Sequence, residues 1–134
     1  MKSGKNLDAE LKFELEQLKR NLVAIINKFI KSREGVTSLF RNPELTDDRI
    51  ALAKKTNKLL MSKSTHDELI DLMQQAQLEN ADLSNKYLKQ HSNHFDRTNN
   101  NEYNNSGLAE ALTTAIDTIN KSKGSQDRLT NNWK

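Results

Sequence analysis

The sequence lacks cysteine and has few of the residues that make tight turns. Without cysteine, the 134-residue chain can form neither disulfides nor thiolate metal sites, and it has no cysteine nucleophile. One proline and 4 glycines are too few for the many reversals of an all-β fold. Hydrophobic residues make up only 34% of the chain, against roughly 45–50% in ordinary globular domains. This composition favours a thin helical bundle over a compact enzyme.

Long hydrophobic runs are missing as well. The longest apolar stretch covers residues 22–26, far short of the roughly 20 residues that a helix needs to cross a bilayer. The residues after Met1 are polar and charged, without the apolar run of a signal peptide. We therefore expect a protein with no transmembrane segment that is intracellular, in the cytoplasm or the nucleus.

The chain does contain a long apolar ladder near its start. It steps by 4, 4, 3, 4, 3 and 4 residues through Leu7, Leu11, Leu15, Leu18, Leu22, Ile25 and Phe29. This spacing is typical of one face of an amphipathic helix, which is unstable until another helix covers its apolar side. We expect this helix to begin near residue 6 and to stop no later than Pro43, because proline lacks the amide proton that a continuing helix needs.

Two further helices are predicted by their start signals. Thr46 is a good N-cap for a second helix, and residues 62–64 offer a break after it. Thr65 and Glu68 have the spacing of a capping box, which predicts the start of a third helix. Its apolar seam contains Asn80, which either faces water because the stripe rotates or is buried and fixes the register. We expect Asn80 to face water.

The last third of the chain is expected to be less regular. Residues 91–106 are polar and rich in asparagine, which favours a flexible linker. A short helix should follow and end at Gly124. The predicted fold is all-α, an elongated antiparallel bundle or coiled-coil-like hairpin of three to four helices. Its expected division is a three-helix bundle over 1–90, the linker over 91–106, and a short helix with a frayed tail over 107–134.

Charge is distributed unevenly along the chain. Residues 19–63 contain eleven basic and four acidic residues, whereas residues 64–118 contain three basic and nine acidic ones. A basic surface could bind phosphate groups, either of nucleic acid or of an anionic membrane. The residues that would bind nucleic acid in this reading are Lys28, Lys31, Arg33, Lys54, Lys55 and Lys58. We favour the alternative, in which the basic and acidic segments lie side by side and neutralise each other.

No catalytic, metal or cofactor motif stands out. His91 and His94 have a metal-ligand spacing, but they fall where the third helix gives way to polar sequence, so two solvated side chains are expected. The acid pairs at Asp47 and Asp67 are explained by helix N-termini, which attract carboxylates. We expect a protein that is not an enzyme and that has no catalytic residues, cofactor or metal.

The ladder carries the functional prediction. It is about 35 Å long, more than the interrupted second helix can cover evenly. We therefore expect a structural or adaptor subunit that assembles with itself or with a partner helix in a multiprotein complex. The predicted partner-binding residues are Leu11, Leu15, Leu18, Leu22, Ile25 and Phe29. The alternative is a nucleic-acid-binding accessory protein that uses the basic segment.

Overall fold

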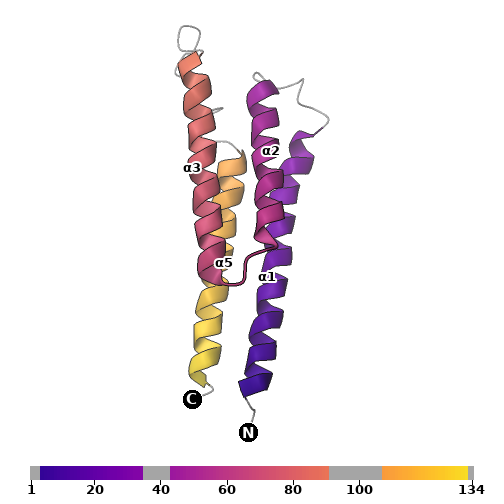
Figure 1. Cartoon of the computed structure of the whole chain (residues 1–134), viewed down its shortest axis with the longest axis vertical. Coiled ribbons are helices and arrows are strands. Elements are labelled where there is room, and N and C mark those ends of the chain that lie inside the picture. The colour runs from indigo at the N-terminus through magenta and orange to yellow at the C-terminus, as the bar shows by residue number, and fades with distance from the viewer. Residues whose placement is uncertain (1–3, 35–42, 91–106, 133–134) are drawn as a thin grey trace.

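The computed structural model describes residues 4–34, 43–90 and 107–132, and in these residues the protein is a bundle of four α-helices without a strand. The helices are α1 (Gly4–Arg33), α2 (Pro43–Leu60), α3 (His66–Gln90) and α5 (Gly107–Asn132). Successive helices run in opposite directions (Figure 1). The prediction of an all-α antiparallel bundle of three to four helices is confirmed.

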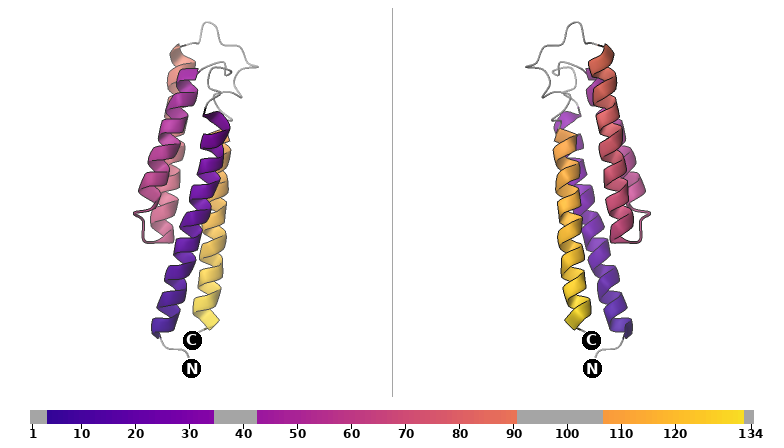
Figure 2. Two further views of the ribbon diagram at one scale, coloured as in Figure 1. Left: turned by 90° about the vertical axis from the view of Figure 1, so that its right-hand side faces the viewer. Right: turned by 90° about the vertical axis from the view of Figure 1, so that its left-hand side faces the viewer.

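The four helices form two layers. Helix α1 packs against α2 and α5, and α3 packs against the same two helices, so each helix has two neighbours. Viewed from the side, α1 and α5 make one layer and α2 and α3 make the other (Figure 2). The layers differ in length, because α1 and α5 continue past the turn that joins α2 to α3. Both ends of the chain lie at this lower end.

Local signals explain where α2 and α3 start. The capping box is present, since the backbone amide of Glu68 donates to Thr65 Oγ1 at 3.1 Å and the Thr65 hydroxyl donates to Glu68 Oε1 at 3.1 Å. Pro43 starts α2 instead of merely stopping α1, because the first helical position needs no amide donor. The predicted N-cap Thr46 therefore lies inside α2.

The last helix is longer than predicted. Helix α5 has 26 residues and continues through Gly124 to Asn132, so Gly124 does not end it. A glycine inside a helix costs only about 0.5–1 kcal/mol relative to alanine. The rest of the helix offsets that cost, because its first three turns are firmly packed. The expected short C-terminal helix is thus one of the four full members of the bundle.

One apolar core runs through all four helices. Its completely buried side chains include Leu22, Ile26, Leu60, Leu69, Met73, Leu108, Leu112 and Ile119. Three of these belong to α5 and lie in the same cluster as those from α1 and α3. The division between a bundle over 1–90 and a separate helix over 107–134 is therefore replaced by a single four-helix core. The predicted linker, 91–106, lies outside the described residues.

A polar cluster is buried between α2 and α3. Arg49 donates from Nε to Asn80 Oδ1 at 3.1 Å and from Nη2 to Ser84 Oγ at 2.8 Å. Asn80 is only 5% exposed, so the expectation that it faces water is wrong. The stripe does not rotate, because Arg49 gives the Asn80 side chain a partner inside the bundle. Sliding α2 along α3 would break both bonds, which favours this register over others.

Candidate assembly surface

The predicted partner-binding residues divide into two groups. Leu18, Leu22 and Phe29 are 2%, 0% and 7% exposed, because the chain's own helices cover them. They are core residues of the folded chain. Leu11, Leu15 and Ile25 are only partly buried. Ile25 borders the groove between α1 and α5, whereas Leu11 and Leu15 lie lower on α1.

Two contacts mark the level at which the α2–α3 layer ends. Lys19 Nζ on α1 donates to the carbonyl oxygen of Met61 in the α2–α3 turn at 3.3 Å. On the other side, Nε2 of His66, the first residue of α3, lies 3.1 Å from Ser122 Oγ on α5. Residues 4–18 of α1 and 123–132 of α5 therefore extend beyond this level. We call these two segments the extension.

Exposed apolar side chains occur close to the extension. Phe13, within it, is 63% exposed, and Met61 and Leu59, at the lower end of α2, are 51% and 40% exposed. Leu78 on α3, which is 62% exposed, lies in the part of the bundle where all four helices are present. The ladder could not indicate Phe13 or Met61, because neither belongs to it. The step between the two layers can be recognised only once the helices are placed.

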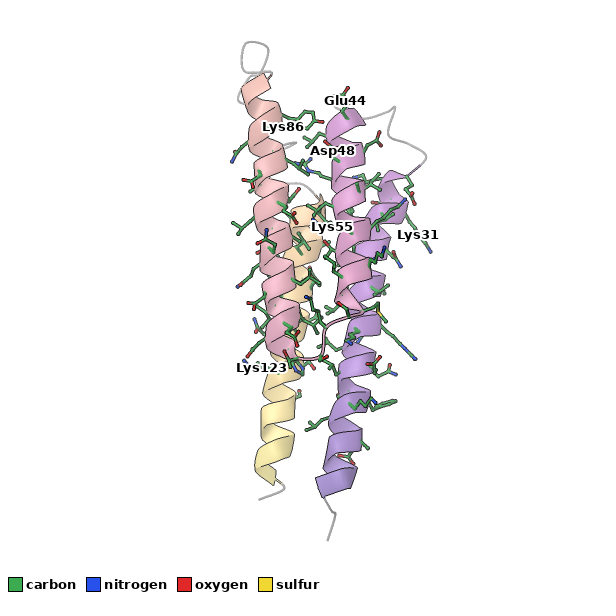
Figure 3. The ribbon with its side chains drawn as sticks, in the orientation of Figure 1. Lys31, Glu44, Asp48, Lys55, Lys86 and Lys123 are labelled. Carbon is green, nitrogen blue, oxygen red and sulfur yellow. The ribbon has the colours of Figure 1, made fainter. Side chains whose placement is uncertain are left out.

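The basic residues of the segment 19–63 do not share one face. Lys28 and Arg33 line the groove between α1 and α5, together with Glu110. Lys31 lies on the outer side of α1, away from Lys55 on α2 (Figure 3). Four of the six predicted nucleic-acid-binding residues are thus spread over more than one surface of the bundle, which weakens the case for one phosphate-binding patch.

Two of these lysines also have acidic partners. Lys54 Nζ on α2 lies 2.7 Å from Oε2 of Glu34, the residue that follows α1. Lys55 Nζ lies 2.8 Å from Glu79 Oε1 across α2 and α3, which joins the basic segment to the acidic one. Such exposed pairs contribute only about 0–1 kcal/mol each, but they lower the local positive charge. This arrangement agrees with the favoured interpretation that the two segments lie side by side.

The first residues of α3 contact α5, although their polar sequence does not indicate such contacts. His66, a polar residue in the first turn of α3, is only 7% exposed and is packed against α5. Beside it, Lys123 Nζ donates to Asp67 Oδ1 at 2.9 Å, and this hydrogen bond lowers the pKa of Asp67. Lys123 lies next to the start of α3 in Figure 3. Helix α5 is thereby attached to α3 at the level where the extension begins.

Tyr87 is a buried titratable group whose pKa is strongly raised. It is 4% exposed, and its hydroxyl donates to Asp48 Oδ2 at 2.9 Å. Burial raises the pKa of Tyr87 to about 12, and the hydrogen bond to Asp48 acts in the same direction. Because the pKa in the folded chain exceeds the ordinary value of 10.0, Tyr87 contributes stability that is present below pH 10 and is lost as the pH rises toward about 12.

We therefore expect an alkaline titration of tyrosinate absorbance to contain a component near pH 12. Tyr87→Phe should remove that component and leave the signal of Tyr103. The variant should also lose less stability than the wild type between pH 10 and pH 12, since phenylalanine has no proton to release. If Tyr87 ionises near pH 10 in the folded chain, the buried hydrogen bond to Asp48 is not maintained in solution.

Candidate metal ligands do not gather in the part of the chain that is described: no group of three or more His, Asp or Glu side chains there could hold an ion. His91 and His94 lie outside the described residues. The groove between α2 and α3 has a volume of about 450 Å³, with Leu52 and Leu83 among its apolar residues and Asp48 and Glu79 among its acids. Charged side chains there are paired within the bundle: Lys55 with Glu79, and Asp48 with the Tyr87 hydroxyl.

Comparisons with known proteins give no information about the function of this surface. Of the helices within the described residues, none is both long and apolar enough to cross a membrane. Searches against protein-family models, curated proteins and solved structures find no match to this chain.

Proposed function

We propose that this protein is a non-enzymatic assembly subunit, structural or adaptor in role, that binds another polypeptide through its α1–α5 extension. One observation carries the proposal. Along a single apolar stripe of α1, Leu18 is 2% exposed while Leu15 and Leu11, one and two turns earlier, are only partly buried. The change occurs at the level where Lys19 contacts the α2–α3 turn.

The exposure of Leu11 and Leu15 arises because the apolar stripe of α1 continues below the α2–α3 turn, whereas α2 ends there. Above Lys19, α1 has α2 on one side and α5 on the other. Below it, in the described part of the chain, α5 is the remaining neighbour. Complete burial of a leucine side chain contributes about 1.5–3 kcal/mol, so the uncovered parts of Leu11 and Leu15 offer a partner helix roughly 1 kcal/mol each.

The test compares the native size of three full-length proteins in cell extract. The wild type should migrate well above its own mass of 15.3 kDa, because a partner is bound to the extension. The double variant Leu11→Asp/Leu15→Asp should migrate as a free chain, since a carboxylate cannot be buried against an apolar partner. The matched control Leu78→Asp, on the exposed side of α3, should behave as the wild type does.

Circular dichroism of the purified variants shows whether they still fold. All three proteins should keep their helix content, because Leu11 and Leu15 are only partly buried, Leu15 being packed against the four-helix core without belonging to it. A wild type that stays at 15.3 kDa both alone and in extract would overturn the proposal.

A further inference from the structure

The extension of one copy matches the space beside the extension of another. Residues 4–18 of α1 span about 22 Å at 1.5 Å per residue. Over this length no described helix of the α2–α3 layer covers the α1–α5 layer (Figure 2). The space to be filled is therefore two helices wide and as long as the extension itself. A second extension has these dimensions.

We propose that a second copy of this chain binds there, with its own extension in the reversed direction, so that two copies form one continuous four-helix bundle. This inference rests on the proposed assembly role and names the partner. The two copies are related by a two-fold axis that crosses the helices at the middle of the extension, at the level of Leu11. Such an interface is closed, so it produces a dimer and not a filament.

Helix directions select this arrangement. All neighbouring helices in the bundle are antiparallel. A two-fold axis across the helices places α1 against α1 of the second copy and α5 against α5, and both pairs are then antiparallel. Leu11 on each α1 then lies opposite Leu11 of the other copy, and Leu15 lies opposite residue 7. The alternative pairing of α1 with α5 of the second copy would make these neighbours parallel.

The helix ends also fit. In the dimer, the second copy's α1 starts below the point where α2 ends at Leu60, and the second copy's α5 ends below the point where α3 starts at His66. Each junction thus sets a helix C-terminus against a helix N-terminus. The partial charges there are of opposite sign, so the contact is favourable. Met61, which is 51% exposed at this turn, would be covered by the second copy.

The size of the interface predicts a weak dimer. The α1 segment is about 22 Å long and the α5 segment about 15 Å, and each is roughly 10 Å wide, so the extension offers about 370 Å² per copy, or about 740 Å² in total. This lies below the 1,200–2,000 Å² of stable complexes, in the range of transient ones. The dimer should therefore dissociate on dilution.

Sedimentation of the purified protein over a wide concentration range tests the identity of the partner. The mass should rise from 15.3 kDa toward twice that value, and Leu11→Asp/Leu15→Asp should remain at 15.3 kDa throughout. A wild type that is monomeric at every concentration but large in extract would overturn the second copy as partner while sparing the assembly role. A monomer under both conditions would overturn both proposals.

Spin-label distances test the orientation, and the absence of cysteine makes the labels unique. In Lys12→Cys, near the two-fold axis, the two labels should lie within about 20 Å of each other, since packed helices are 8–10 Å apart. In the matched control Lys86→Cys, at the far end of α3, they should be about 80 Å apart at 1.5 Å rise per residue. Short distances at both positions would mean that the copies lie side by side, which contradicts the proposal.

Discussion

Leu22→Asp is expected to unfold the whole bundle. Leu22 is 0% exposed and belongs to the core cluster that joins all four helices. A carboxylate at this position would be buried without a partner, and its cost should exceed about 4–5 kcal/mol. Since domains of ordinary stability have about 5–15 kcal/mol in total, most or all of the folded population should be lost.

Far-UV circular dichroism and urea unfolding measure this loss. The matched control is Leu78→Asp, the same chemical change at a side chain that is 62% exposed, which should alter stability by no more than about 0.5 kcal/mol. If Leu22→Asp keeps its helix content and merely loses association, then the ladder at Leu22 is an open binding surface, contrary to the fold described above. The same substitution thus separates a core role from a binding role.

Leu112→Ala is expected to destabilise the entire chain by about 2–5 kcal/mol, because it leaves a cavity where α5 meets the core. Leu112 is 0% exposed, so little relaxation can fill the space. The transition in urea should stay single and should move to lower denaturant concentration. Lys121→Ala, on the exposed side of α5, should leave the midpoint nearly unchanged.

The outcome that would contradict this prediction is a second transition. If residues 107–132 melted early while the other three helices kept their stability, the division of the chain at residues 91–106 would be correct after all. One shared transition would show that α5 is as much part of the folding unit as α1.

The apolar spacing predicted the main features of the fold, because core-facing positions recur with the helical period. The ladder correctly placed a long first helix, and Thr65 with Glu68 correctly placed the start of the third. The length of α5 was not predictable from Gly124, since a single glycine weakens a helix without necessarily ending it. Helix α5 continues past Gly124 because the helix as a whole is held by its packing against α1 and α3.

Buried polar groups were the least predictable part of the molecule. Asn80 was expected to face water, and nothing in the sequence indicated that His66 is buried, because a polar side chain in a sequence gives no sign of its partner. Their partners, Arg49 and Ser122, are 31 and 56 residues away. The candidate surface has the same difficulty: its boundary depends on where α2 ends relative to α1, which is a property of the assembled bundle.

The position of the chain ends has a practical consequence. Both termini lie at the free end of the α1–α5 layer, opposite the start of α5 (Figure 1). A bulky fusion domain at either terminus would therefore stand where a binding partner must approach, and it could mask association in the assays above. A short peptide tag, or a fluorophore attached to a cysteine introduced at Leu78, would leave that approach open.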